Sequence, residues 1–301
     1  MHITLRQLRV FEAVAVHLNF TRAAEELHLS QPAVSMQIRQ LEDVVGVELF
    51  EKLGKRIQLT EAGRELFHYG QGIINQLREA EEVLESLKGL SGGRIKLAVA
   101  STVNYFAPRL LAAFHRRYPE INLHLDVTNR EALVRLLDAN EADLVMMGHP
   151  PDNLQLVTEP FMENPLVVIA PPQHPLAKQP NISLERLAEE VFVMREPGSG
   201  TRQAMERFFY DHGLEIRKGM EMTRNEAIKQ AVRAGLGLSI VSIHTIELEL
   251  ETGRLIALDV EEFPILRGWN LVHRRGKRLS PAAQAFREFV LSGSFRDWLE
   301  P

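Results

Sequence analysis

Residues 20–45 read FTRAAEELHLSQPAVSMQIRQLEDVV, and the fold of the N-terminal part of the chain follows from them. Their small and apolar residues recur at helical spacing on both sides of a tight break at residues 28–30. Ser30 is placed to cap the helix after the break, and Pro32 falls in its first turn, where a missing N–H costs nothing. Two short helices joined in this way predict a helix-turn-helix, whose second helix enters the major groove of DNA.

A further helix is expected before this stretch, and Thr21 is the expected N-cap of the helix that opens it. The first helix has an apolar stripe with steps of three or four residues. That stripe is Leu5, Leu8, Phe11, Ala15 and Leu18. The third helix has a buried stripe of its own, and Gly46 ends it. That stripe is Val34, Ile38, Leu41 and Val45.

The side of the third helix away from its buried stripe is expected to face DNA bases. Gln and Arg side chains pair with two atoms of a base edge, and Ala contacts the thymine methyl. Residues 49–52 and 56–59 predict a two-stranded wing with Gly54 at its tip, where basic side chains suit phosphates or a minor groove. The residues expected at DNA are Thr21, Arg22, Ser30, Gln31, Pro32, Ala33, Ser35, Met36, Gln37, Arg39, Lys52, Lys55 and Arg56. On spacing alone, a helical bundle with a hairpin that binds no DNA is the alternative.

Charge and length set limits on this prediction. The formal net charge is −5 at pH 7, and residues 1–60 hold equal numbers of basic and acidic side chains. The DNA prediction therefore depends on motif geometry and on where the cations lie. The 301 residues are enough for two or three units of ~100–200 residues each.

Composition favours a cytoplasmic protein with no membrane partner. The chain has no cysteine, which excludes disulfides, thiolate metal sites and cysteine nucleophiles and fits a reducing compartment. No apolar run reaches the ~18 residues that a membrane span needs. The first residues lack the charged, apolar and small-residue regions of a signal peptide.

Residues 61–90 predict one long helix with a seam for a partner helix. Its apolar residues alternate steps of four and three over about three heptads, which is typical of a two-stranded coiled coil. Gly70 is a weak point in the seam. The residues expected at the dimer contact are Leu66, Ile73, Leu77, Ala80, Leu84 and Leu87. A long helix packed on its own domain is the alternative, and residues 89–93 (GLSGG) are the expected hinge.

Residues 91–301 predict an α/β domain. Short apolar runs such as 95–100, 122–127 and 143–147 alternate with segments of helical spacing, which favours a parallel sheet. The predicted organisation is thus a DNA-binding domain over residues 1–60, a linker helix over 61–90 and this larger domain.

The N-terminal motifs resemble the LysR family of bacterial transcriptional regulators. FTRAAE at 20–25, LSQPAVS at 29–35 and LTEAG at 59–63 match in order and spacing within about sixty residues. The resemblance implies a winged helix-turn-helix of mainly α structure, with residues 31–33, Ser35 and Arg39 at or near promoter DNA. It also implies a homodimer or homotetramer that meets RNA polymerase. Position 36 often carries a basic residue in similar proteins, and this chain has Met36.

The C-terminal region is similar to the effector domain of the same family. That domain shares the fold of type-2 periplasmic binding proteins, in which two subdomains hold a ligand in the cleft between them. The resemblance implies one subdomain of residues 94–163 and 268–301 and a second of residues 164–267. A non-covalent small molecule is the expected effector, with no cofactor and no metal.

Ligands of open α/β sheets bind beyond the carboxyl ends of the strands. A stretch from Arg195 to Arg202 also places small and hydroxyl residues at a helix start, where free N–H groups and the helix dipole attract anions. The residues expected at the effector are Ser101, Thr102, Asn104, Thr128, Asn129, Gly148, His149, Pro150, Glu196, Gly198, Ser199, Gly200, Thr201 and Arg202. Simple helix capping is the alternative for Ser101, Thr102 and Ser199.

GSGTR at 198–202 and MGHPP at 147–151 resemble the CbbR type of LysR regulator, which controls carbon-dioxide-fixation genes. The resemblance implies a phosphorylated sugar or acid, or a nucleotide, as the effector. His149 replaces what is often Arg in similar proteins, which leaves the anion that it contacts open and adds a possible dependence on pH.

Two other classes of protein compete with this interpretation. A solute-binding protein would share the cleft but not the N-terminal ninety residues. An enzyme on the same fold would need a metal cluster or a nucleophile motif. The sequence has no G-x-S-x-G nucleophile elbow, since the letters GLSGG at 89–93 fall in the expected hinge, and it has no H-E-x-x-H pattern. The sequence leaves open the effector, the operator, activation against repression, and dimer against tetramer.

Overall fold

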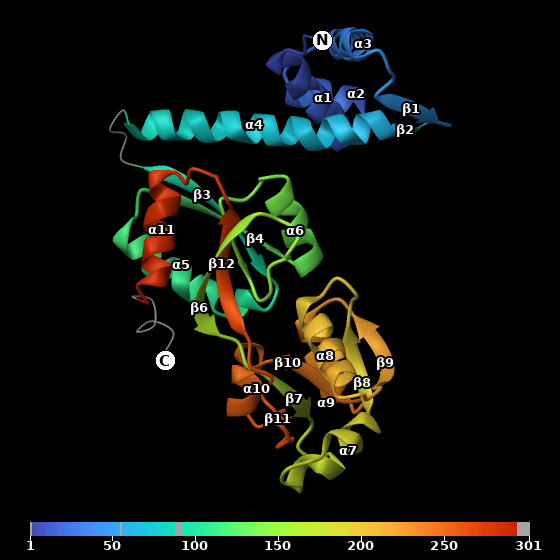
Figure 1. Cartoon of the computed structure of the whole chain (residues 1–301), viewed down its shortest axis with the longest axis vertical. Coiled ribbons are helices and arrows are strands. Elements are labelled where there is room, and N and C mark those ends of the chain that lie inside the picture. The colour runs from blue at the N-terminus through green and yellow to red at the C-terminus, as the bar shows by residue number, and fades with distance from the viewer. Residues whose placement is uncertain (1, 55, 88–91, 294–301) are drawn as a thin grey trace. The chain divides into compact units, whose positions relative to one another are not determined.

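The computed structural model describes residues 2–54, 56–87 and 92–293, with the backbone alone for residues 79, 82, 83 and 85–87. These residues form two compact units, which are described one at a time. The elements of the first unit are α1 Leu5–His17, α2 Phe20–Glu26, α3 Gln31–Val45, β1 Phe50–Leu53, β2 Arg56–Leu59 and α4 Glu61–Leu87 (Figure 1). Within these described ranges, no helix is both long enough and apolar enough to cross a membrane.

Helices α1 to α3 pack around a small common core. Val14, Val34 and Leu41 are fully buried in it. Each such side chain contributes roughly 1.5–3 kcal/mol through burial. The Phe11 ring lies 5.4 Å from the ring of Phe50, so an aromatic contact joins the start of the wing to the helical core.

Two details of the predicted helices are wrong. Leu5 and Leu18 are 44% and 45% exposed, because they lie at the two ends of α1 and Leu18 has already left the helical conformation. Thr21 does not cap α2. The side chain of Asn19 accepts hydrogen bonds from the N–H groups of Thr21 and Arg22, since the helix begins two residues earlier than predicted.

The wing is held to the helices by side chains and by a close approach. The carboxylate of Glu42 accepts a hydrogen bond of 2.8 Å from the N–H of Leu49, just before β1. Strands β1 and β2 pair antiparallel, and Leu53 faces Arg56 across the turn. A Cβ on Gly63 would lie 2.1 Å from the carbonyl oxygen of Leu49, so the first turn of α4 requires glycine there.

Helix α4 has one face on its own domain and one apolar face toward solvent. Leu66 packs against the core of α1 to α3, and Ile74 is only 4% exposed. Ile73 and Leu84 are 46% and 58% exposed. The helix therefore packs on its own domain and also presents an unburied apolar stripe, while its contact with a second copy stays a prediction.

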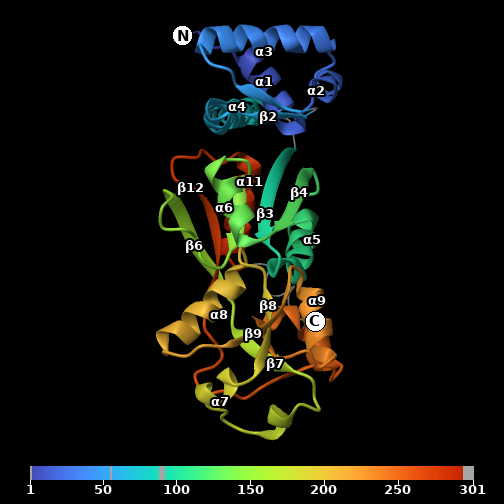
Figure 2. The same ribbon diagram turned by 90° about the vertical axis from the view of Figure 1, so that its right-hand side faces the viewer.

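The second unit begins with a five-stranded sheet in the order β4-β3-β5-β12-β6. Its strands are β3 Gly93–Ala100, β4 Ile121–Thr128, β5 Leu144–Met147, β6 Leu156–Glu163 and β12 Gly268–Arg274. Helices α5 Ala107–Arg117, α6 Arg130–Asp138 and α11 Pro281–Leu291 cover it (Figure 2). We call this part the first lobe.

Residues alternate between the two faces of this sheet, as the strand period requires. Leu97 and Val99 point into the core that α5 and α11 cover, where Phe114 and Phe286 stack edge to face at 4.9 Å. Ala98 points to the opposite face, which α6 covers. The first lobe is therefore a sheet between helices.

The second lobe has the same layers around smaller sheets. Its strands are β7 Leu166–Ala170, β8 Val191–Arg195, β9 Arg217–Met222, β10 Ser239–Ser242 and β11 Ile256–Ala257. Its helices are α7 Leu184–Ala188, α8 Gly200–Asp211, α9 Asn225–Arg233 and α10 Glu247–Glu251. Helix α8 covers one face with Phe209, and α9 covers the other with Ile228.

The chain crosses between the lobes twice, after β6 and before β12. The two crossing segments are tied by a hydrogen bond of 2.7 Å from the N–H of Asn164 to the carbonyl of Arg267. The predicted parallel pairing is found among β4, β3 and β5. Strand β12 departs from it and runs antiparallel to β5 and β6, because it returns from the other lobe and enters the sheet from the opposite end.

Candidate functional site

The outward face of α3 carries the residues expected at DNA. Ser30 caps the helix by accepting a hydrogen bond of 3.4 Å from the N–H of Ala33. Met36 is 55% exposed, and Arg39 is exposed as well. The amide of Gln31 donates to the hydroxyl of Ser35 at 2.8 Å, so these two polar side chains are held together on the first turn and a half.

Basic side chains surround this face. Arg22 at the start of α2, Arg39 on α3, and Lys52 and Arg56 on the wing are all exposed. In the part of the chain that the structure describes, none of these four forms an ion pair, so all are free to meet phosphates. Lys55 lies outside the described residues.

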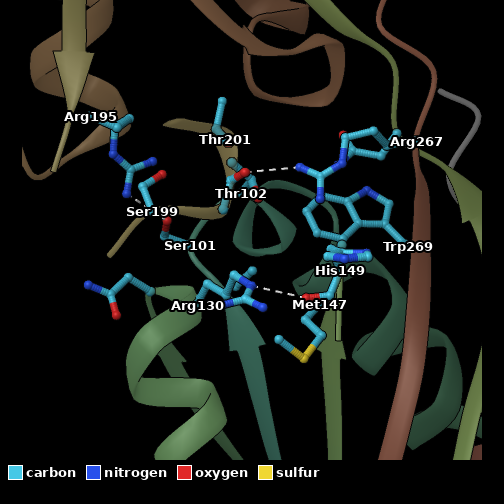
Figure 3. Close-up of a pocket in the computed structure, with 15 residues that line it drawn as sticks. Ser101, Thr102, Arg130, Met147, His149, Arg195, Ser199, Thr201, Arg267 and Trp269 are labelled. Atoms are coloured by element: carbon cyan, nitrogen blue, oxygen red, sulfur yellow. Dashed lines mark hydrogen bonds between the residues drawn. The ribbon is translucent and has the colours of Figure 1, made fainter. Parts of the chain in front are cut away.

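A pocket in the second unit lies between the two lobes (Figure 3). From the first lobe it takes residues that follow β3 and β5 and residues that begin α6. From the second lobe it takes the end of β8 and the start of α8, and both crossing segments contribute as well. The lining residues are Ala100, Ser101, Thr102, Asn129, Arg130, Met147, Gly148, His149, Asn164, Arg195, Ser199, Gly200, Thr201, Arg267 and Trp269.

Two arginines of this pocket have no carboxylate partner among the described residues: Arg130 and Arg267. Arg130 donates to the carbonyl of His149 at 3.1 Å, and Arg267 donates to the carbonyl of Gly200 at 3.0 Å (Figure 3). Burial lowers the pKa of Arg267, and the positive charge of Arg130 lowers it further. Two guanidinium groups that repel each other in a partly buried site are stabilised by an anion between them.

The hydroxyl residues and a helix end extend this positive region. Ser199 caps α8 by accepting from the N–H of Arg202 at 3.5 Å, and it also lines the pocket. Thr201 lies in the same first turn, whose leading N–H groups lack partners within the helix. Thr102 is 6% exposed and makes no capping hydrogen bond, so capping does not explain it.

The other two arginines near the pocket are neutralised. Arg195 pairs with Glu196 at 2.8 Å and donates to the hydroxyl of Ser101 at 3.3 Å. Arg202 pairs with Glu206 at 3.1 Å and with Glu221 on β9 at 2.6 Å. Arg202 does not line the pocket, and its charge is not available to an anion in the cleft.

The predicted effector residues fall into two cavities. Eight line the pocket with Arg130 and Arg267: Ser101, Thr102, Asn129, Gly148, His149, Ser199, Gly200 and Thr201. Asn104, Thr128 and Glu196 line a second, wider cavity beside it, which also includes Ser101 and Asn129. Pro150, Gly198 and Arg202 line neither.

Direct contacts hold the two lobes together on both sides of the pocket. The N–H of Glu131 on α6 donates to the carbonyl of Gly198 at 3.3 Å. On the other side, the hydroxyl of Tyr105 donates to Glu226 on α9 at 2.8 Å. Burial raises the pKa of Tyr105, and its bond to Glu226 raises it further.

Glu226 belongs to a charged cluster around a buried lysine. Lys229 has a side chain only 4% exposed, with Glu226 at 2.6 Å and Glu249 at 3.0 Å. Its ammonium also lies 5.0 Å from the ring centre of Tyr105. Within the described residues, no group of His, Asp or Glu side chains is arranged to hold a metal ion.

Comparison with known proteins matches both units. The model of the bacterial regulatory helix-turn-helix protein of the lysR family matches residues 5–64, and that of the LysR substrate binding domain matches residues 88–294. The chain belongs to the LysR family of bacterial transcriptional regulators. The resemblance seen in the sequence is thereby confirmed, together with the winged helix-turn-helix and the two-lobed α/β effector domain.

Relatives within the LysR family point to carbon fixation. A RuBisCO operon transcriptional regulator from Allochromatium vinosum is 71% identical over 296 residues, covering 98% of both chains. CbbR from Rhodospirillum rubrum is 44% identical over 286 residues, covering 95% of both. The solved regulatory domain of Synechocystis PCC6803 CcmR in complex with 2-PG is 44% identical, with a TM-score of 0.65, covering 67% of this chain and 96% of that one.

Sequence reasoning missed seven residues of the pocket: Ala100, Arg130, Met147, Asn164, Arg195, Arg267 and Trp269. Arg130 follows Asn129 directly, so the strand-end rule that selected Asn129 would have reached it one residue later. Asn164 and Arg267 lie in the crossing segments, which have no motif. Only the tertiary structure brings these segments into the pocket.

Proposed function

We propose that this LysR-family regulator binds promoter DNA as a homodimer or homotetramer and controls carbon-fixation genes in response to a small phosphorylated acid. In this proposal residues 1–60 read DNA, residues 61–90 join two copies and residues 91–301 bind the effector. The 71% identity to a RuBisCO operon regulator supports the choice of genes. Bound at a promoter in the bacterial cytoplasm, the protein would act on RNA polymerase.

The effector proposal is carried by the pair Arg130 and Arg267. Both arginine side chains approach Gly200: Arg267 donates to its carbonyl at 3.0 Å, and a Cβ there would lie 3.5 Å from Cδ of Arg130, whose guanidinium donates to the carbonyl of His149. The start of α8 adds N–H groups and the hydroxyls of Ser199 and Thr201. A compact ligand with several negative charges satisfies these donors together.

2-Phosphoglycolate meets this requirement, since it carries a phosphate and a carboxylate on two carbon atoms. The solved complex of the CcmR regulatory domain with 2-PG supports the choice, because that domain is 44% identical to this chain. The proposal gives the pocket no catalytic task. Its cations are arginines, which keep their protons near neutral pH and so do not act as acids or bases.

Opening or closing of the cleft between the two lobes would transmit effector binding to the DNA-binding domains. The pocket is lined by both lobes and by both crossing segments, so an anion bound there contacts every part that moves when the cleft opens or closes. A ligand that binds the closed arrangement more tightly shifts the population toward it. In a pair of copies, that shift would change how the two DNA-binding domains meet their half-sites.

Titration calorimetry with the full-length chain tests the effector proposal. We expect 2-phosphoglycolate to bind and Arg267→Gln to weaken it by about tenfold to a hundredfold, because a charge-assisted hydrogen bond contributes ~1.5–3 kcal/mol. Arg254→Gln is the matched control, since Arg254 is exposed in the same lobe and outside the pocket. Equal binding by Arg267→Gln and the wild type would disprove the assignment.

A further inference from the structure

The outward face of α3 carries a large apolar side chain in an unusual place. Met36 is 55% exposed, whereas Val34, two residues earlier, is fully buried. At 3.6 residues per turn, Met36 lies about 200° around the helix from Val34. It therefore lies in the middle of the outward face, with Pro32 on the previous turn and Arg39 on the next.

The polar neighbours of Met36 have other tasks. Gln31 is bonded to Ser35 at 2.8 Å, and Gln37 donates to Gln40 at 3.4 Å. The thioether of Met36 offers no strong hydrogen bond and instead fits irregular apolar surfaces. In the major groove, the apolar feature of a base edge is the C5-methyl group of thymine.

We propose that Met36 is a specificity-determining residue that reads thymine through its C5-methyl group, once in each half-site. The inference rests on the proposed role of α3 in reading DNA. It adds to that role a base preference and the atom that carries it. Burying Met36 against a methyl group also removes from water an apolar side chain that the free protein leaves exposed.

The test is a gel-shift titration of the full-length chain on one genomic fragment that it binds. The fragment is made twice by enzymatic synthesis, once with dTTP and once with dUTP, so that only the thymine methyls differ. We expect weaker binding to the uracil duplex, by about fourfold for each contacted methyl and about sixteenfold where two copies bind. Replacing single thymines by uracil should then locate one sensitive base in each half-site.

Three variants make the comparison specific. Met36→Ala should bind both duplexes with nearly equal affinity, whereas Val16→Ala, which removes another exposed apolar side chain from the same domain, should keep the wild-type difference. Ala33→Gly measures the share of the other apolar residue near this face. The unfolding temperature of each variant shows whether the domain is intact, which we expect because Met36 and Val16 lie at the surface.

The outcomes separate the two proposals. A wild-type chain with equal affinity for both duplexes, or a Met36→Ala variant with an unchanged thymine preference, would refute the role of Met36 while leaving DNA binding in place. A chain that binds no genomic fragment would instead refute the role of α3, and the role of Met36 with it.

Discussion

At the scale of single residues, the same side chain has different roles according to its neighbours. Arg202 and Arg267 are both arginines near the cleft, but Arg202 is held by Glu206 and Glu221, whereas Arg267 donates to the carbonyl of Gly200 and pairs with no carboxylate of the described residues. The sequence favoured Arg202 because it follows a helix start. A positive charge that carboxylates already neutralise attracts no further anion, so Arg267 is the better candidate for binding an anionic effector.

Glycines show the same dependence on surroundings, and two in α4 give a prediction. Gly63→Ala should destabilise the N-terminal domain by about 1–3 kcal/mol, since the new Cβ would lie 2.1 Å from the carbonyl oxygen of Leu49. Gly72→Ala should stabilise it by about 0.8–1 kcal/mol, because among the described residues no atom outside the local helix backbone lies within 4 Å of the new Cβ and alanine favours a helix. Thermal unfolding of the full-length chain measures both, and shifts of the same sign would contradict the prediction.

At the scale of elements, the two faces of α4 have different surroundings. Ile74 faces its own domain and is 4% exposed, while Ile73, one residue earlier, is 46% exposed. Residues 100° apart on a helix point to different surroundings. One edge of a heptad stripe can therefore pack on its own domain while the other edge is available to a partner helix. Of the predicted seam, Ala80 and Leu84 are exposed, Leu66 and Leu77 are half-buried, and the side chain of Leu87 lies outside those described.

The exposed apolar stripe of α4 is expected to hold two copies together. Ile73→Lys with Leu84→Lys should shift the full-length chain toward monomer, because two charges would have to enter an apolar contact. Sedimentation equilibrium measures the change. His68→Lys, about 200° from Leu66 on the same helix, is the control and should leave the assembly unchanged. Equal masses for all three proteins would exclude this stripe as the contact.

The contact between η1, Val103–Tyr105, and α9 predicts a dependence on pH. Burial raises the pKa of Glu226, but its bonds to Lys229 and Tyr105 outweigh this, so the net pKa of Glu226 is lowered. A lowered carboxyl pKa gives stability that is present above about pH 4.3 and is lost as the pH falls through the lower value. Between roughly pH 5 and pH 3, the unfolding temperature of the wild-type protein should therefore fall further than that of Glu226→Gln.

The readout for that prediction is the difference between two melting curves at each pH. Tyr105→Phe removes one of the two hydrogen bonds and should give an intermediate slope. If the unfolding temperatures of the wild type and Glu226→Gln fell in parallel with pH, the bonds of this carboxylate to Lys229 and Tyr105 would not stabilise the folded state.

At the scale of the whole molecule, DNA binding and effector binding lie in separate compact units. The formal net charge is −5, so attraction to DNA cannot come from the overall charge. We expect it to come from exposed cations around α3 and the wing, which among the described residues include Arg22, Arg39, Lys52 and Arg56.

DNA affinity should accordingly depend steeply on salt. If each of two copies neutralises four phosphates, a plot of log affinity against log salt concentration has a slope of about −7. Arg56→Ala should reduce this slope by about 2 in such a pair and leave effector binding unchanged. Gel-shift titrations from about 50 to 200 mM salt measure it. A slope near zero would show that these cations do not meet phosphates.

The sequence by itself determined the family, the helix-turn-helix and the strand-and-helix alternation, since each depends on spacing over a few residues. The Ser30 cap, the Pro32 turn and the buried stripe at Val34 are local features, and the structure confirms all three. The order of strands could not be predicted in the same way. Strand β12 comes from the far end of the chain, and its antiparallel entry depends on contacts between distant residues.

Only the tertiary structure decided which charges face the pocket. Eight of the predicted residues line it, because they follow strand ends or begin helices, which are local properties. Glu221 on β9 pairs with Arg202, whereas no element within residues 2–54, 56–87 and 92–293 brings a carboxylate to Arg130 or Arg267. Electrostatic environment is a sum over neighbours in space, and spacing along a sequence does not contain it.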